Sequence, residues 1–262
     1  MKNKKIHKYS SDYYISKYSN TRNKSEDLFM SERYFIPRYL KPGISILDFG
    51  CAAGGFSQIL AEYYDDIKYH GVDISSEMID RARLSYPDKF FTHIDFDNSL
   101  IELDNIKFDL VQSWGVTVHA PDYQKILKKL WDLTSHSLIF DMRLKIHGEE
   151  ILSKDLSYSL NPGGIKYYYI VANMFHFIKF LISSHNSIPK SIEIIGYIAK
   201  PNEYTVIPDD ITDVYMCGFG LVKSERADNS HTNIYINMPK QVFQQISKNF
   251  NNLSTVTLHH LV

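Results

Sequence analysis

Apolar runs and helical repeats alternate along the first half of the chain. Apolar stretches bounded by turn residues predict strands at residues 44–49, 68–74, 90–96 and 137–143, and a further one that begins at Phe108. Between them, apolar positions recur at helical spacing, as in Phe56, Ile59, Leu60 and Tyr63. Alternating strands and helices are typical of a parallel sheet with helices on both faces, and such sheets bind ligands beyond the carboxyl ends of the strands.

The segments outside this alternation of strands and helices predict secondary-structure elements in a less regular order. Turn residues at 161–164 separate residues 156–160 from residues 166–173, a pattern typical of a β-hairpin. The other predicted elements are helices over 27–40, 174–184 and 239–249 and strands over 191–197 and 214–223. Residues 1–26 are polar and rich in tyrosine, which fits either a segment that closes over a ligand or an arm packed on the surface.

Composition and charge limit the class of partner. The chain has 262 residues, 44% of them hydrophobic, enough for one sizeable α/β domain or two small ones. The formal net charge of -1 gives no general attraction to nucleic acid or an anionic membrane, so we expect a small-molecule substrate. Cys51 and Cys217 lie in different predicted elements, and we expect no disulfide, signal peptide or membrane span, which favours a cytoplasmic protein.

The first predicted strand leads into a loop of small residues and then into a helix. Gly50, Ala52 and Gly54 leave the loop backbone open to close approach by a ligand. Free N–H groups at the start of the helix complete a geometry typical of nucleotide binding. Asp48, two residues before the first glycine, repels a pyrophosphate but suits a cationic group such as the ammonium of an amino acid.

The sequence Leu47-Asp48-Phe49-Gly50-Cys51-Ala52-Ala53-Gly54-Gly55 resembles the first motif of class I S-adenosylmethionine-dependent methyltransferases, with Ala52 in place of the middle glycine. The resemblance extends over residues 44–143. It implies an α/β fold with a Rossmann-like seven-stranded mixed sheet, helices on both faces, an antiparallel last strand and a hairpin inserted after the fifth strand. It also implies that S-adenosyl-L-methionine is the cofactor and S-adenosyl-L-homocysteine the product.

Acids close the second and third predicted strands. Asp73 lies 25 positions after Asp48, near the ~20-residue offset at which an acid meets ribose hydroxyls in such folds. Asp73 also fits a turn or helix-capping role, because a helix capped by Ser75 follows it. In the resembled family, the acid after the third strand accepts a hydrogen bond from the adenine amino group and the next residue lies along the base. These positions match Asp95 and Phe96.

The fourth predicted strand ends in a polar and aromatic cluster. This cluster is similar to the family's fourth-strand motif, which borders both the methionine portion of the cofactor and the substrate. The residues that we expect at the cofactor are Asp48, Gly50, Cys51, Ala52, Gly54, Asp73, Ile74, Met78, Asp95, Phe96, Gln112, Ser113 and Trp114. We expect no metal.

The candidate catalytic residues follow the fourth and fifth strands. A general base is needed only when the acceptor is a hydroxyl or a protonated amine. His119 is the candidate base because imidazole titrates near neutrality, and a structural role is the alternative. Asp141, Arg143 and His147 are either acceptor-facing groups or ordinary surface residues.

These observations favour a methyltransferase that acts on a hydroxyl or amine of a small molecule, for instance a sugar or nucleotide-sugar. One alternative is a catalytically silent cofactor-binding or partner subunit. Another is an NAD-dependent oxidoreductase, against which Asp48 and the glycine spacing argue. A macromolecular target is disfavoured by the neutral charge and by Gln112-Ser113-Trp114-Gly115, which stands where an Asn-Pro-Pro-Tyr-type motif would lie. The oligomeric state is left open.

We expect a single domain with consecutive functional parts. These are an N-terminal arm or lid with a helix, a cofactor-binding core, a substrate-side insertion with a helix, closing strands, and a C-terminal extension, at residues 1–43, 44–143, 144–190, 191–224 and 225–262. The extension carries no functional signal.

Overall fold

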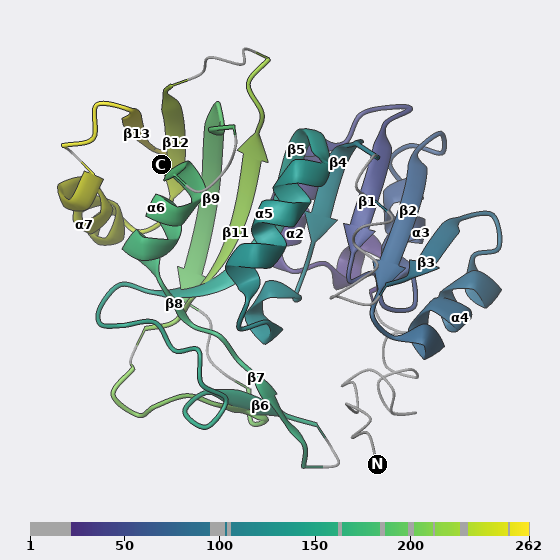
Figure 1. The fold of residues 1–262 in the computed structure, drawn as a ribbon, viewed down its shortest axis with the longest axis horizontal. Coiled ribbons are helices and arrows are strands. Elements are labelled where there is room, and N and C mark those ends of the chain that lie inside the picture. The colour runs from purple at the N-terminus through teal and green to yellow at the C-terminus, as the bar shows by residue number, and fades with distance from the viewer. Residues whose placement is uncertain are drawn as a thin grey trace.

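The computed structural model describes residues 22–94, 103, 106–161, 164–183, 187–198, 202–211, 213–225, 230–250 and 252–261. A ten-stranded sheet forms its centre, in the order β3-β2-β1-β4-β5-β11-β9-β12-β13, with β8 paired to the end of β5 (Figure 1). The strands are β1 (Ser45–Phe49), β2 (Lys68–Asp73), β3 (Phe90–His93), β4 (Phe108–Ser113), β5 (Thr134–Lys145), β8 (Ala172–Asn173), β9 (Ser191–Ile198), β11 (Tyr215–Val222), β12 (Thr232–Asn237) and β13 (Val256–His260).

The topology of the first strands follows the alternation of strands and helices in the sequence. β1 pairs in parallel with β2 and β4, β2 with β3, and β4 with β5. β11 runs antiparallel between β5 and β9. The Rossmann-like fold class with an antiparallel strand is therefore confirmed, but the sheet does not stop at seven strands. It continues beyond β9 through β12 and β13.

The two additional strands come from the C-terminal extension, for which the sequence predicted only the helix. In β12, the side chains of Ile234 and Ile236 are buried while the residues between and beside them are partly exposed. Ile234 and Ile236 join the same apolar core as Val242 and Ile246 of α7, the helix between β12 and β13. The extension is thus a strand-helix-strand unit that buries one face of its own helix and lengthens the sheet.

Helices cover both faces of the sheet. They are α2 (Met30–Tyr39), α3 (Gly55–Ala61), α4 (Ser76–Ser85), α5 (Tyr123–Leu133), α6 (Met174–Ser183) and α7 (Lys240–Phe250), with short 3-10 turns η2 (Ser25–Asp27) and η4 (Thr117–His119). Ile46 and Leu110 belong to the core under α2, α3 and α4, whereas Leu47 and Val111 belong to the core under α5, α6 and α7. Neighbouring strand residues point to opposite faces, so each central strand contributes to both cores.

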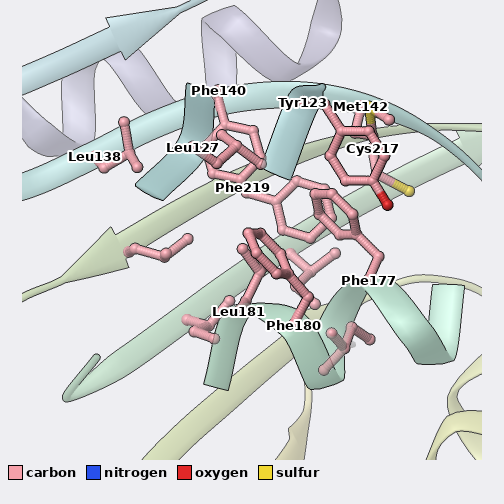
Figure 2. Packing of buried hydrophobic residues seen from close by; sticks show 14 of the residues in the cluster. Tyr123, Leu127, Leu138, Phe140, Met142, Phe177, Phe180, Leu181, Cys217 and Phe219 are labelled. Atoms are coloured by element: carbon pink, nitrogen blue, oxygen red, sulfur yellow. The ribbon is translucent and has the colours of Figure 1, made fainter. Parts of the chain in front are cut away.

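Aromatic rings fill the core between β5, β11 and α6. The rings of Phe140 and Phe219 stack with centroids 5.1 Å apart and an interplanar angle of 11°. Phe177 from α6 lies against both rings, at 6.2 Å from Phe140 and 5.1 Å from Phe219 (Figure 2). Tyr123 from α5 lies 5.7 Å from Phe177. This aromatic cluster joins α5 and α6 to the parallel strand β5 and to its antiparallel neighbour β11.

The predicted hairpin forms part of a second, smaller sheet. β6 (Tyr158–Leu160) pairs antiparallel with β7 (Lys166–Tyr168) and with β10 (Thr205–Val206). The predicted second hairpin strand, residues 166–173, is divided, because Ala172 and Asn173 leave the hairpin and pair with the end of β5 as β8. In Figure 1 this small sheet lies beyond the carboxyl ends of the main parallel strands.

Replacing Phe177 by alanine tests the aromatic cluster. The Phe177→Ala change removes a fully buried ring and leaves a cavity between α6 and the sheet, which should cost about 3–5 kcal/mol of unfolding free energy in urea denaturation. The control is Phe90→Ala, because the side chain of Phe90 is 64% exposed. An equal loss in both variants would contradict the central position of Phe177.

Candidate functional site

The loop between β1 and α3 packs tightly against the ends of neighbouring strands. Gly50 has a φ of +82°, and a Cβ there would lie 2.2 Å from Cγ2 of Val116, which follows β4. Gly54 has a φ of +83°, and a Cβ there would lie 2.8 Å from the ring of Phe91 in β3. Both positions combine a left-handed backbone with a close approach, so glycine is required. The small residues of the motif therefore shape the loop itself.

Asp73, at the end of β2, holds this loop in place. Its Oδ2 accepts a hydrogen bond from the backbone N–H of Ala52 at 2.9 Å, and its Oδ1 accepts one from the N–H of Ser75 at 2.9 Å. Ala52 has a φ of +48°, a left-handed conformation that is unfavourable for alanine. The turn role that the sequence allowed for Asp73 is thus present in the structure. A carboxylate oxygen can accept more than one hydrogen bond, so these contacts are compatible with a ribose hydroxyl as a further donor.

Asp48 is buried at the end of β1. The Tyr69 hydroxyl donates to its Oδ2 at 2.5 Å, and Gln112 is its partner in the register between β1 and β4. Burial raises the pKa of Asp48 to about 6, although hydrogen bonds from Tyr69 and Gln112 and the charge of Arg22 act in the opposite direction. A buried carboxylate with this pKa is stabilised in its charged form by a nearby cation.

Three consecutive residues at the end of β4 bury polar side-chain atoms. Oγ of Ser113 and Nε1 of Trp114 have no hydrogen-bond partner among the described residues, and the amide of Gln112 is buried beside Asp48. Buried polar groups in proteins are nearly always hydrogen-bonded, and leaving one unpaired costs about 1–3 kcal/mol. Unpaired donors and acceptors grouped at the carboxyl edge of a parallel sheet are typical of a site that a polar ligand completes.

His119 connects the end of the β4 segment to the insertion. It lies in η4, and its Nδ1 is 2.7 Å from the carbonyl oxygen of Tyr168 in β7. Because a carbonyl only accepts, this contact requires a proton on Nδ1 and leaves the lone pair of the neutral ring on Nε2. The backbone N–H of Ile170 also donates to the carbonyl of Val118 at 2.8 Å. The orientation of the imidazole is therefore fixed by the insertion.

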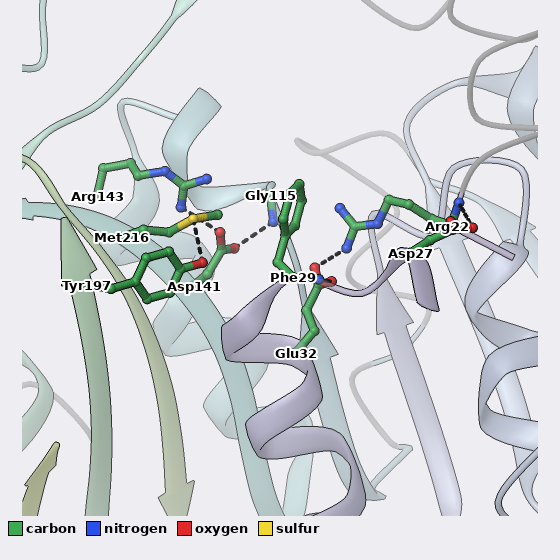
Figure 3. A network of polar contacts seen from close by, with 9 residues as sticks. All are labelled: Arg22, Asp27, Phe29, Glu32, Gly115, Asp141, Arg143, Tyr197 and Met216. Carbon is green, nitrogen blue, oxygen red and sulfur yellow. Dashed lines mark hydrogen bonds and ion pairs between the residues drawn. The ribbon is translucent and has the colours of Figure 1, made fainter. Parts of the chain in front are cut away.

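Asp141 and Arg143 form a buried ion pair near the end of β5. Nη1 of Arg143 donates to Oδ2 of Asp141 at 2.6 Å, and the N–H of Gly115 donates to Oδ1 at 2.6 Å (Figure 3). Burial acts to lower the pKa of Arg143, but the charge of Asp141, the effect of Tyr169 and the hydrogen bonds to both together outweigh it, so the net shift is upward. Neither residue is an ordinary surface group. Asp141 fixes the loop after β4, and His147, in contrast, is exposed.

The remaining predicted cofactor residues lie at different depths. Cys51 and Met78 are buried, with Met78 completely enclosed, and Ile74 is partly buried against the core. The Ser75 side chain accepts from the N–H of Met78, as expected for the cap of α4. Asp95 and Phe96 lie outside the described residues.

A second buried charge pair, which the sequence analysis did not identify, lies beside the loop. Glu32 in the first turn of α2 is paired with Arg22 and also accepts from the N–H of Phe29 at 2.8 Å. Burial raises the pKa of Glu32, and Arg22 acts to lower it. The sequence placed Glu32 inside the predicted helix over 27–40, and it lies in the first turn, where acids favour a helix start, because α2 begins at Met30.

Comparisons with known proteins agree with this geometry. A family model described as a methyltransferase domain matches residues 47–136, from β1 into the start of β5. A 2-methyl-6-phytyl-1,4-hydroquinone methyltransferase of Synechocystis sp. PCC 6803 is 35% identical over 92 residues. That match covers 35% of this chain and 29% of the relative, so the chain matches less than a third of the relative's length.

Solved structures extend the similarity in fold to most of the chain. The N-terminal domain of EvdMO1, crystallised in the presence of S-adenosylhomocysteine and D-fucose, has a TM-score of 0.54 and 12% identity, and the match covers 81% of this chain and 95% of that one. The O-methyltransferase of a trans-AT PKS multienzyme of Brevibacillus brevis has a TM-score of 0.50 and 13% identity, with coverage of 82% and 74%. The resemblance to class I S-adenosylmethionine-dependent methyltransferases is confirmed, and the cofactor of that family is S-adenosylmethionine.

None of the described helices combines the length and apolar character needed to cross a membrane. Within the same residues, no three His, Cys, Asp or Glu side chains are grouped as metal ligands.

The pH dependence of stability tests the environment of Asp48. Its pKa is raised from 3.8 to about 6, so the folded state holds this proton more tightly than the unfolded state. Deprotonation between pH 4 and 6 should therefore lower the unfolding free energy, by about 3 kcal/mol at most. Asp48→Asn lacks this ionisation, so in urea denaturation its stability relative to wild type should rise from pH 4 to pH 7.

The control for this test is Asp88→Asn, because the side chain of Asp88 is 70% exposed. This variant should show no such gain with rising pH. A difference between Asp48→Asn and wild type that stays constant across the pH range would contradict the burial effect.

Proposed function

We propose that this chain, whose core is that of a class I S-adenosylmethionine-dependent methyltransferase, transfers a methyl group to a hydroxyl or amine of a small molecule. The observation that carries the proposal is the set of polar groups at the carboxyl ends of β1, β2 and β4. Asp48 is a buried acid, Asp73 accepts from the backbone of the loop, and Gln112 buries its side-chain amide at the register position opposite Asp48. All three lie next to a loop that glycines fold tightly.

The chemistry of these groups fits S-adenosylmethionine. Asp73 would accept from the ribose hydroxyls while it keeps its two backbone hydrogen bonds. Asp48 would face the ammonium of the methionine portion, and this cation would offset the cost of burying the carboxylate. Gln112, Ser113 and Trp114 would supply the donors and acceptors that border the methionine portion. When bound, the cofactor supplies an electrophilic methyl group on a sulfonium.

The chain has to hold the acceptor in line with that methyl group and exclude water. Positioning of this kind contributes about 7–11 kcal/mol to lowering the barrier in favourable cases. The acceptor side would be formed by His119 and by the insertion, which extends beyond the carboxyl ends of the parallel strands (Figure 1). For a hydroxyl acceptor, Nε2 of His119 would take the proton, while the Tyr168 carbonyl holds Nδ1–H in place.

Within this class of acceptor, we favour a sugar or nucleotide-sugar. Tyr158 and Tyr168 are directly paired across β6 and β7, so their side chains lie on the same face of the small sheet. An aromatic ring with a hydroxyl at its tip offers both an apolar surface and a hydrogen bond. This combination suits a sugar ring, which has C–H faces and hydroxyl edges.

Calorimetric titration tests the cofactor. The purified protein should bind S-adenosylmethionine and S-adenosylhomocysteine saturably and should not bind NAD, because Asp48 repels a pyrophosphate. Asp73→Ala should weaken S-adenosylhomocysteine binding at least tenfold, about 1.4 kcal/mol. Asp88→Ala, at an exposed carboxylate, is the control and should bind as wild type does.

Binding of NAD alone would replace this proposal with the oxidoreductase. Binding of S-adenosylmethionine without turnover on any acceptor of the proposed class would favour the silent subunit instead. An unchanged affinity in a folded Asp73→Ala protein would remove Asp73 from the cofactor site.

The pH profile of turnover tests His119. With a hydroxyl acceptor, kcat/KM should rise with pH and level off as the imidazole loses its proton, and His119→Gln should abolish this rise and lower kcat about 10²–10⁴-fold. His231→Gln provides the control, because His231 lies in an exposed part of the C-terminal extension. If His119→Gln keeps both the rate and the profile, His119 has the structural role instead.

A further inference from the structure

Arg143 is held from two sides near the end of β5. Its Nη1 donates to Oδ2 of Asp141 at 2.6 Å (Figure 3). Its guanidinium is also hydrogen-bonded to Tyr169, which lies between β7 and β8. Asp141 belongs to the main sheet, whereas Tyr169 belongs to the insertion. The two contacts therefore fix the guanidinium at a place where the insertion meets the main sheet.

The guanidinium has hydrogen-bonding capacity beyond these two contacts. A guanidinium carries five N–H donors in a planar fork, which matches the oxygens of a carboxylate or a phosphate. The side chain of Arg143 is 12% exposed, so it is not fully enclosed. A donor group that the protein already holds in one orientation loses little conformational freedom when a ligand binds.

Open space lies beside the ion pair. Gly115 follows β4 and donates its N–H to Oδ1 of Asp141 at 2.6 Å. It has a φ of +70°, and a Cβ there would meet no heavy atom of the described residues within 4 Å. At Gly50 and Gly54, by contrast, a Cβ would collide with a neighbouring side chain. The segment after β4 is thus open at the point where it contacts Asp141.

The same region contains the candidate base. Oγ1 of Thr117 donates to the backbone carbonyl of Asp141 at 2.5 Å, and η4 continues from Thr117 to His119. The carbonyl of Tyr168 contacts the imidazole of His119, and the next residue along the chain contacts the guanidinium. Two consecutive residues of the insertion therefore hold the candidate base and the guanidinium.

The charges around the guanidinium favour direct hydrogen bonding as the means of recognition. Asp141 and Arg143 together carry no net charge. Glu32, on which the charge of Asp141 also acts, is paired with Arg22. The side chains from β9 and β11 that lie next to the pair in Figure 3 are a neutral tyrosine and methionine. An anion at this place therefore gains from N–H donation by the guanidinium fork and not from an excess of positive charge.

We propose that Arg143 binds a carboxylate or phosphate group of the acceptor and so selects anionic acceptors over uncharged ones. The inference rests on the proposed function, because it requires an acceptor at the carboxyl edge of the sheet. It narrows the favoured sugars to those with an acidic or phosphorylated substituent, and the diphosphate of a nucleotide-sugar belongs to this class. Asp141 and Tyr169 act as positioning residues, since they orient the guanidinium.

Sugars that differ at one carbon provide the test. D-glucuronate carries a carboxylate there, D-glucose 6-phosphate carries a phosphate, and D-glucose has an uncharged hydroxyl. In calorimetric titrations of protein saturated with S-adenosylhomocysteine, the wild type should bind at least one anionic sugar about tenfold more tightly than D-glucose. Arg143→Met should remove this preference and leave the affinity for S-adenosylhomocysteine within about twofold of the wild-type value.

Three further variants separate recognition from folding. Arg143→Met leaves Asp141 buried without its cation, so the double variant Asp141→Asn/Arg143→Met removes that charge and should show the same loss of preference. Arg143→Lys keeps the positive charge but lacks the planar fork, and should recover only part of the preference. The matched control is Arg81→Met, because Arg81 is exposed on α4, and it should bind every ligand as wild type does. Thermal unfolding shows that each variant is folded.

The outcomes distinguish this inference from the proposed function. If the wild type does not bind S-adenosylhomocysteine, the proposed function fails and the inference fails with it. If it binds S-adenosylhomocysteine but neither anionic sugar more tightly than D-glucose, or if Arg143→Met keeps the preference, the inference is overturned while the cofactor assignment stands. If Arg143→Met and the double variant weaken S-adenosylhomocysteine as much as the sugars, Arg143 has a structural role only. A wild-type preference for one of the two anionic sugars identifies the bound group as a carboxylate or a phosphate.

Discussion

The carboxylate of Asp73 joins the parts of the chain on which the candidate site depends. It accepts from Ala52 in the loop after β1 and from Ser75 before α4, so one side chain fixes the ends of two adjacent strands. The loop needs this support because Ala52 has an unfavourable left-handed backbone. Without the two hydrogen bonds, the N–H of Ala52 would be unpaired and the glycines would no longer be held in their close contacts.

The same principle operates at β5. Asp141, near the end of this strand, accepts from the N–H of Gly115 and from Arg143, and so fixes the segment after β4. Acids at the carboxyl ends of parallel strands thus serve two purposes. They stabilise loops that have left the regular hydrogen bonding of the sheet, and they place negative charge where ligands of such sheets bind.

Much of the core could be predicted because its signals are local. The apolar run ending at Phe49, the glycine loop and the cap at Ser75 are each visible within a few residues. The pair of Arg22 and Glu32 could not be predicted in this way, since the chain must first fold over α3 to bring them together. β12 was missed for another reason: its alternation of buried and exposed residues was present, but polar neighbours obscured it. The departure of Ala172 and Asn173 from the hairpin depends on β5, a partner distant in sequence.

In the proposed reaction, the contact between His119 and the carbonyl of Tyr168 links acceptor choice to reactivity. The small sheet that would contact the acceptor also supplies the atom that sets the imidazole tautomer. An exchange of this insertion for that of a relative would therefore change more than the shape of a pocket. Unless the new segment presents a backbone oxygen at the same point, the contact that holds Nδ1–H is lost. Side chains of the insertion can change without this loss, whereas its backbone path at Tyr168 cannot.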